Sequence, residues 1–354
     1  MFWKKQTQSQ EGTGTAVQAT GNVIITVNNQ GLTVGDVKEI ALDVMRANLL
    51  DFKGRAQETA LERGAEITDK FLAKLAEDNP EGLQQAETPD FQDALFTIQK
   101  EYAKAGDADL GDLLVDLLVD RTKQEERNIM QIVLNESLHT APKLTDGQIA
   151  ALSAIFLCRY VQNNGLGSIA ALGEFLEKHI GATIGKISYS DSTFNHLEFA
   201  GCGTVSAFGG HSLEGIWTQI YPGLFKSGFE EAKTEGLQLS AEVMRRLILP
   251  CLNDATKLQV AALNMTVLEE KLVANGVGVE DAQTLKNLLT EGTYGEPEIR
   301  TRVLAVAPFL TEFLDRWKAT SISKFSLTSV GMAIGHANIK RITGEFSSLK
   351  IWIN

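Results

Sequence analysis

The chain has 354 residues, of which 44% are hydrophobic and 22% are charged, and its net charge is −12. This length suffices for two or three domains, and this composition excludes wholesale disorder. The negative charge opposes long-range attraction to nucleic acids and to anionic membranes. We find neither a signal-peptide core nor a run of about 18 apolar residues, so we expect a cytoplasmic protein without membrane segments. Three well-separated cysteines agree with a reducing compartment.

The first 32 residues divide into two segments of different character. Residues 1–11 are polar and predict a disordered tail. Residues 12–32 are rich in Gly, Thr and β-branched residues, which predicts two short strands. A β unit this small is unstable on its own in water, so we expect copies of the chain to pair through it as a homo-oligomer. The apolar residues expected at this contact are Val17, Val23, Ile25 and Val27.

Residues 33–78 carry a helical pattern. Thr33 and Asp36 match a capping box at its start, and apolar residues then recur at steps of mostly three and four. The pattern predicts a single amphipathic helix of about forty residues, which would be about 60 Å long. A helix of that length favours a coiled-coil contact with another helix or another subunit. We therefore assign Val37, Ile40 and Val44 to the oligomer contact.

The rest of the chain predicts further helices. Residues 88–184 predict a helical domain, and residues 185–296 predict a second one with an insertion of loop and strand. Residues 297–354 predict a small α+β unit. The fold class is therefore mainly α, with a multi-helix body, a short N-terminal β segment, a long N-terminal amphipathic helix and a small C-terminal α+β unit.

One predicted helix carries a stripe of carboxylates. Asp112, Asp116 and Asp120 are four residues apart and share one helical face, where oxygen ligands can converge on Mg²⁺. The same residues alternate with leucines, as in a solvated stripe opposite a core-facing one. A metal site also needs ligands from a second element, and the sequence shows none. We expect a solvated stripe and no metal, with these aspartates as the metal candidates.

Cysteine and histidine occur close together in one segment. Cys202 follows His196, and His211 comes soon after, so an imidazole-activated thiolate or a Cys/His zinc site is one interpretation. The spacing matches no specific motif. Gly201 and Gly203 flank the cysteine, and a close backbone approach or a tight turn explains them more simply. We therefore favour the structural interpretation, with these three residues as the catalytic candidates.

Cofactor motifs are weak. Gly165-Leu166-Gly167 imitates part of a dinucleotide fingerprint, but the preceding residues predict a helix rather than the required strand. The phosphate-binding pattern G-x-x-x-x-G-K-[ST] does not occur. We expect no cofactor.

The C-terminal unit is basic. From Glu298 onward eight Lys and Arg stand against four acidic residues, an excess of +4 that leaves −16 for the rest of the chain. A strand, a helix over 328–343 and a final strand over 349–353 have a winged-helix-like order. Lys324, Lys340 and Arg341 are therefore candidates for nucleic-acid contact. Strong DNA binding uses six to ten phosphate contacts, so we favour protein docking for this unit.

Several segments carry a resemblance to a known family. These are Gly12–Gly14, Val17–Val23, Asp36–Val44, Leu134–Leu138, Pro142–Thr145, Leu327–Gly331 and Ile351–Ile353. Together they resemble an uncharacterised bacterial family with a short Gly/Gln/Asn/Val β-forming N-terminal prefix. The closing section is similar in style to abortive-infection proteins with a winged-helix-like tail. The resemblance implies a role in antiphage or stress defence and supplies no catalytic residues.

These observations lead to three hypotheses. The leading one is a non-enzymatic homo-oligomeric scaffold or sensor, in antiphage defence, whose partners are itself and another protein. The second is a defence nuclease or hydrolase that uses the Cys/His residues or the aspartate stripe. The third is a DNA-binding regulator that uses the basic C-terminal unit.

Overall fold

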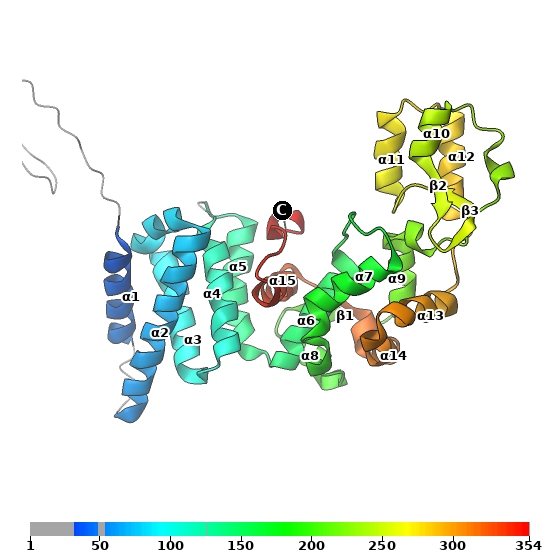
Figure 1. Cartoon of the computed structure of the whole chain (residues 1–354). Coiled ribbons are helices and arrows are strands. Elements are labelled where there is room, and N and C mark those ends of the chain that lie inside the picture. The colour runs from blue at the N-terminus through cyan, green and yellow to red at the C-terminus, as the bar shows by residue number, and fades with distance from the viewer. Residues whose placement is uncertain (1–31, 49–53, 125, 354) are drawn as a thin grey trace, which may run out of the picture.

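The computed structural model describes residues 32–48, 54–124 and 126–353, and the fold is mainly α as expected. The strands form two small two-stranded antiparallel sheets within these residues. Figure 1 shows a row of packed helices from which one smaller group of elements projects. In the part of the chain described, no helix combines the length and the apolar character that crossing a membrane requires. The predicted tail 1–11 and nearly all of the predicted β segment 12–32, including Val17, Val23, Ile25 and Val27, lie outside the described residues.

The N-terminal part of the row is a bundle of five helices (Figure 1). They are α1 (Val34–Asn48), α2 (Arg55–Asp78), α3 (Pro89–Ala105), α4 (Ala108–Thr122) and α5 (Ile129–Thr140). Each of α3, α4 and α5 begins at a capping residue whose side chain accepts a backbone N–H from the first turn. Their buried faces form one apolar core with the middle of the chain.

The single long helix predicted over residues 33–78 is wrong. Helix α1 ends at Asn48, α2 starts at Arg55, and the two helices pack against each other and against α3. Gly54, at φ 61°, precedes α2 in a left-handed conformation that an α-helix cannot continue. Turning back buries the apolar stripe of α1 inside the chain, where Val37 is fully buried.

The middle of the chain supplies the most deeply buried helix, α6 (Asp146–Tyr160), in which every residue from Gln148 to Cys158 is buried. The other helices of this part are α7 (Ile169–Leu176), α8 (Asp191–Phe199), α9 (Leu213–Ile220), α13 (Glu296–Val306) and α14 (Thr311–Ala319). Of these, α9 contacts α6, and α13 and α14 contact α9. Helix α15 (Ser329–Thr343) packs across α6 and also contacts α4 and α5, so it joins the two parts of the row (Figure 1).

The C-terminal residues are therefore not a separate winged-helix-like unit. Strand β4 (Phe325–Leu327) confirms the strand predicted there, and it pairs with β1 (Gly203–Val205) from the middle of the chain. The final strand predicted over 349–353 is wrong, because residues Leu349–Ile351 form a 3₁₀ turn. Trp352 follows that turn, and its indole N–H donates to the Tyr160 carbonyl oxygen at 2.7 Å. This partly buried contact fixes the chain end against α6.

Residues 226–293 form a lobe with its own apolar core, which projects from the remaining described residues, called the body here (Figure 1). Its elements are α10 (Ala241–Leu247), β2 (Ile248–Cys251), β3 (Asp254–Val260), α11 (Met265–Ala274) and α12 (Val279–Thr290). Strands β2 and β3 form an antiparallel hairpin, and Leu247, Leu268 and Leu285 are fully buried beside it. The lobe is thus an inserted unit with a second hydrophobic core.

Candidate functional site

Both chain connections between body and lobe pass through one short antiparallel neck, residues 225–228 and 291–294. Lys226 is bridged to Thr293. The Ser227 N–H donates to the Gly292 carbonyl oxygen at 2.8 Å, and the Tyr294 N–H donates to the Phe225 carbonyl oxygen at 2.9 Å. Any change in the neck therefore acts on both connections at once.

The side chain of Lys226 is buried in this neck, with 3% of the residue's surface exposed. Its Nζ donates to the Glu291 carbonyl oxygen at 2.9 Å and to Thr293 Oγ1 at 2.6 Å. Both acceptors are uncharged. Burial disfavours the ammonium and lowers the pKa of Lys226 to about 8, although the Glu291 carboxylate partly opposes this shift.

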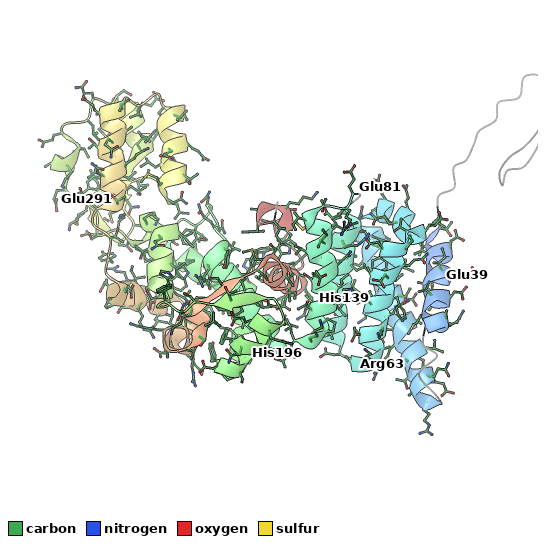
Figure 2. The ribbon with its side chains drawn as sticks, turned by 180° about the vertical axis from the view of Figure 1, so that it is seen from behind. Glu39, Arg63, Glu81, His139, His196 and Glu291 are labelled. Carbon is green, nitrogen blue, oxygen red and sulfur yellow. The ribbon has the colours of Figure 1, made fainter. Side chains whose placement is uncertain are left out.

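Lys226 lines a cleft of about 330 Å³ at the base of the lobe. The apolar part of the wall comes from Phe229 and Leu288. Two further cationic side chains, Lys233 and Lys257, also line it. Lys233 Nζ lies 3.1 Å from the Glu291 carboxylate, and both side chains are more than half exposed. Figure 2 shows Glu291 at the base of the lobe, well away from His196 on the body.

Hydrogen bonds from the β2–β3 hairpin tie the far wall of the cleft to the body. Asn253 Nδ2 donates to the carbonyl oxygens of Leu224, at 2.9 Å, and Lys226, at 3.0 Å. Gln259 Nε2 donates to the Gly223 carbonyl oxygen at 3.1 Å. The cleft is thus framed by both neck segments, the hairpin and the end of α12. Lowered pKa values of buried groups that line a cleft are typical of functional sites.

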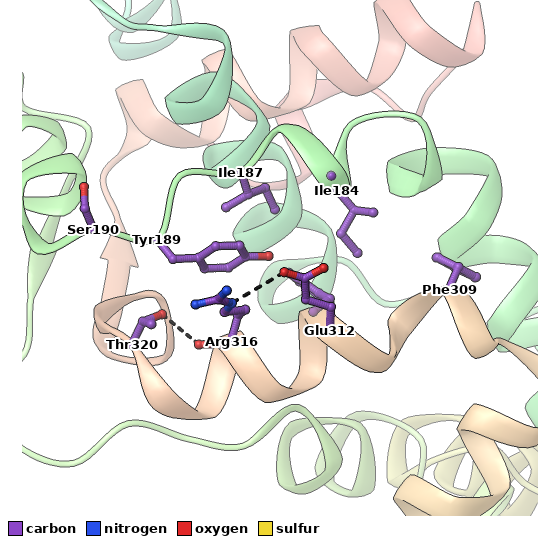
Figure 3. Close-up of a pocket in the computed structure, with 10 residues that line it drawn as sticks. Ile184, Ile187, Tyr189, Ser190, Phe309, Glu312, Arg316 and Thr320 are labelled. Carbon is purple, nitrogen blue, oxygen red and sulfur yellow. Dashed lines mark hydrogen bonds and ion pairs between the residues drawn. The ribbon is translucent and has the colours of Figure 1, made fainter.

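A larger cavity of about 550 Å³ lies between α14 and the segment 184–190 (Figure 3). Tyr189, Glu312 and Arg316 converge at its polar end in Figure 3. Burial raises the pKa of Tyr189 to about 12, with Glu312 adding to the shift. The Glu312–Arg316 pair, 3.5 Å apart, is 78% and 55% exposed at its side chains, so it contributes little. The charged residues of this cavity are solvated, whereas the neck cleft contains the buried Lys226, which favours the neck cleft as the candidate site.

A third cavity, of about 530 Å³, lies where α4, α5 and the chain end meet. Lys340 Nζ lies 3.1 Å from Asp120 and 3.5 Å from Asp78. Burial opposes the charge of Lys340, but Asp120, Asp116 and Asp78 outweigh it and raise the pKa of that lysine. His336 is buried beside them, and burial lowers its pKa. The lysine here serves as a counter-ion for the carboxylates.

The predicted carboxylate stripe is an ion-pair ladder between helices rather than a convergent metal site. Asp112 lies 3.1 Å from Lys70, and Asp116 lies 3.6 Å from Lys74, both on α2. Asp120 is paired with Lys340, and the side chain of Asp116 is only 6% exposed. The expectation that these two aspartates are solvated is therefore wrong. Within the described ranges, no group of three or more His, Cys, Asp or Glu residues could hold a metal ion.

The three catalytic candidates, Cys202, His196 and His211, do not line any of the cavities described above. Cys202 is fully buried in the main core, and burial raises its pKa to about 12, so its thiol stays protonated at neutral pH. The structural interpretation of the flanking glycines is confirmed, because Gly201 has a left-handed φ of 77° and a Cβ at Gly203 would overlap the Ser326 carbonyl oxygen. A Cβ at Gly331 of α15 would likewise overlap the Cys202 carbonyl oxygen. His196 Nδ1 is hydrogen-bonded to Gln148 Nε2 at 2.8 Å, and His211 is exposed.

The nucleic-acid candidates do not form one basic face. Lys340 is 13% exposed at its side chain and pairs with two aspartates, and Arg341 Nη1 lies 2.8 Å from Asp109. Lys324 is exposed on the turn before β4. Two of these three cations are therefore neutralised by carboxylates of the α2–α4 bundle.

The α1 residues expected at an oligomer contact have partners within the chain. Val37, Ile40 and Val44 surround a small apolar space together with Phe91 and Leu95 of α3. Sequence reasoning missed Lys226 altogether. Its signal is faint: a single lysine directly after the apolar run Gly223-Leu224-Phe225.

Comparisons with known proteins assign the chain to a family. Among curated proteins and among solved structures, none matches the chain. The model of an uncharacterised protein family, described as a "-like" family, matches residues 31–353. This match covers the whole of the described body and lobe, and the chain therefore belongs to that family.

Proposed function

We propose that the protein is a non-enzymatic sensor that acts through protein contacts, with the neck cleft as its ligand site and the lobe as its responding part. One observation carries the proposal. Lys226 is buried where both connections to the lobe meet, beside a cavity, and its Nζ has only uncharged acceptors. A buried amine without a charged partner next to an open space is a binding group for a ligand.

The cleft is placed to couple a ligand to the lobe. Its walls come from the first neck segment, from Lys257 on β3 and from Leu288 near the end of α12. A ligand that touches all three walls would favour one arrangement of the neck over others, and it would shift the population of lobe positions by its difference in affinity for them. The separate core of the lobe lets it move as a unit.

The lobe also offers a surface suited to a protein partner. Val273 and Val279 flank the turn between α11 and α12 and are 83% and 87% exposed. Large exposed aliphatic side chains gain free energy when a partner covers them. The body serves as the scaffold that presents this tip.

A distance measurement tests the sensor proposal. Spin labels at Val279→Cys on the lobe and Phe199→Cys on the body report on lobe position, and the native cysteines are buried and will not react. We expect Lys257→Trp, which fills the cleft, to shift the label-to-label distance distribution. Glu270→Trp, on an exposed face of α11, is the matched control. Identical distributions in all variants would rule out coupling between cleft and lobe.

Self-association through residues 12–32 and a setting in bacterial defence are further parts of the proposal. The first is supported by the β-forming pattern of that segment, and the second by the resemblance of the closing segments to abortive-infection proteins. Deletion of residues 1–31, followed by measurement of the mass in solution, tests the first part. An unchanged mass rejects it.

A further inference from the structure

We infer that Lys226 is a carbonyl-reactive residue that captures a small aldehyde or ketone in the neck cleft as a reversible imine. This inference rests on the proposed function only in taking the neck cleft to be the ligand site. It adds the chemical class of the ligand and the atom that holds it, the Lys226 Nζ.

The hydrogen-bond geometry suits the neutral amine. A neutral amine has two hydrogens and one lone pair, and Lys226 Nζ has two acceptors, the Glu291 carbonyl oxygen and Thr293 Oγ1. The Thr293 hydroxyl can donate its own hydrogen to the Thr290 carbonyl oxygen, 3.3 Å away, which leaves its lone pairs for Lys226. Both amine hydrogens are thus satisfied, and the lone pair remains for the cleft.

No carboxylate bonds directly to this nitrogen within the described part of the chain. The Glu291 carboxylate is engaged with Lys233 instead. Lys340 is the contrasting case, because its two aspartates hold it as an ammonium. A lysine that burial desolvates can act as a nucleophile toward carbonyl groups.

The capture step balances without any further reactant. The Lys226 amine attacks the carbonyl carbon and forms a C–N bond, giving a carbinolamine after proton transfer from nitrogen to oxygen. The carbinolamine then loses its oxygen as water, and a C=N bond remains. One amine and one carbonyl compound give one imine and one water, nothing is oxidised or reduced, and hydrolysis reverses the step.

The cleft also selects the carbonyl compound. Its volume of about 330 Å³ admits a small molecule, and Phe229 and Leu288 provide an apolar wall. Lys257 and Glu230 line the same cleft, and the other carboxylate of the lining, Glu291, is paired with Lys233 rather than with Lys257. An anionic group on the ligand would therefore be attracted to Lys257, and we assign the ligand to the small carbonyl compounds that carry a carboxylate.

Reductive trapping tests the inference on the full chain. Glyoxylate and cyanoborohydride are added at neutral pH, and modified lysines are mapped by mass spectrometry. A pKa lowered from 10.5 to about 8 gives Lys226 a neutral fraction roughly 300-fold above that of an ordinary lysine. We expect its labelling rate to exceed that of Lys340, the internal control, by more than about tenfold.

Variants make the outcome decisive. Lys226→Arg should remove the adduct while circular dichroism stays that of the folded protein, and Lys257→Ala should slow labelling by glyoxylate more than labelling by uncharged propanal. Labelling spread over surface lysines, with Lys226 unmodified, overturns the inference. The sensor proposal is judged separately. An adduct at Lys226 without a change in lobe position supports the imine inference and rejects the sensor. A change in lobe position without an adduct at Lys226 supports the sensor and rejects the imine inference.

Discussion

Lys226 Nζ and Thr293 Oγ1 lie 2.6 Å apart across the neck, where a lysine from the first connection meets a threonine from the second. The two residues are 67 positions apart in the sequence. Their bond joins the start of the lobe to its end, and it does so with a neutral acceptor. Lys226 therefore holds the two neck segments together while its pKa stays below that of an ordinary lysine.

Removing the threonine acceptor should weaken the neck. In Thr293→Val the side chain keeps its shape, but Lys226 loses one of its two acceptors in a buried position, so we expect a loss of about 1 to 2 kcal/mol in the free energy of unfolding. Urea denaturation measures it. Thr284→Val, at an exposed position of α12, is the control and should change stability by less than about 0.5 kcal/mol. Equal effects at the two positions would show that the Lys226 bond contributes nothing.

The lowered pKa of Lys226 predicts a pH dependence of stability. Between pH 8 and 10.5 the unfolded chain keeps the proton on this lysine while the folded chain loses it, so unfolding binds a proton and stability rises with pH. Relative to Lys226→Met, the free energy of unfolding of the wild-type protein should rise by about 2 to 3 kcal/mol between these two pH values. Denaturation curves at several pH values in both proteins check this. A difference that stays constant with pH would place the pKa of Lys226 in its ordinary range.

The cavity near the chain end predicts a strong effect of a single charge. Lys340→Met removes the counter-ion that Asp120 and Asp78 share, although Asp120 keeps Lys123 at 2.9 Å, and we expect the free energy of unfolding to fall by about 2 kcal/mol. The double variant Lys340→Met/Asp120→Asn removes part of the uncompensated charge and should recover stability. Thermal unfolding of the two variants gives the comparison. If Lys340→Met were as stable as the wild-type protein, the lysine would be free for another role, including contact with phosphates.

The mainly helical fold could be predicted from the sequence because helices depend on local patterns of apolar and capping residues. The predicted capping box, for example, is present at the start of α1, where the Thr33 N–H donates to Asp36 Oδ2 at 2.8 Å and the Asp36 N–H donates to Thr33 Oγ1 at 3.2 Å. The single helix over 33–78 failed because the apolar stripe of α1 fits a partner within the same chain as well as a partner outside it. Periodicity shows which face is buried, but it does not show what covers that face.

The site was beyond sequence reasoning for a related physical reason. The environment of Lys226 is made by residues 65 and 67 positions away, and its local pattern is that of an ordinary surface lysine. The aspartate stripe is a second case in which the sequence does not reveal the long-range partners of a charged residue. Its spacing suggested either solvent or a metal, whereas the partners of Asp112 and Asp116 are lysines of α2. Long-range pairing decides the chemistry of a titratable group.

The contact between Gly331 and Cys202 gives the sharpest test of the buried thiol as a structural residue. A methyl group at position 331 would overlap the Cys202 carbonyl oxygen, which is backbone and cannot rotate away, so Gly331→Ala should cost about 2 kcal/mol or more in stability. Gly167→Ala is the control, because a Cβ there meets no atom within 4 Å. Urea denaturation compares them, and a thiol reagent at neutral pH reports on access to Cys202. We expect a slow reaction in the wild-type protein and a faster one in Gly331→Ala, because displacement of the α15 start exposes the sulfur. Rapid modification of Cys202 in the undisturbed protein would instead restore it as a candidate nucleophile.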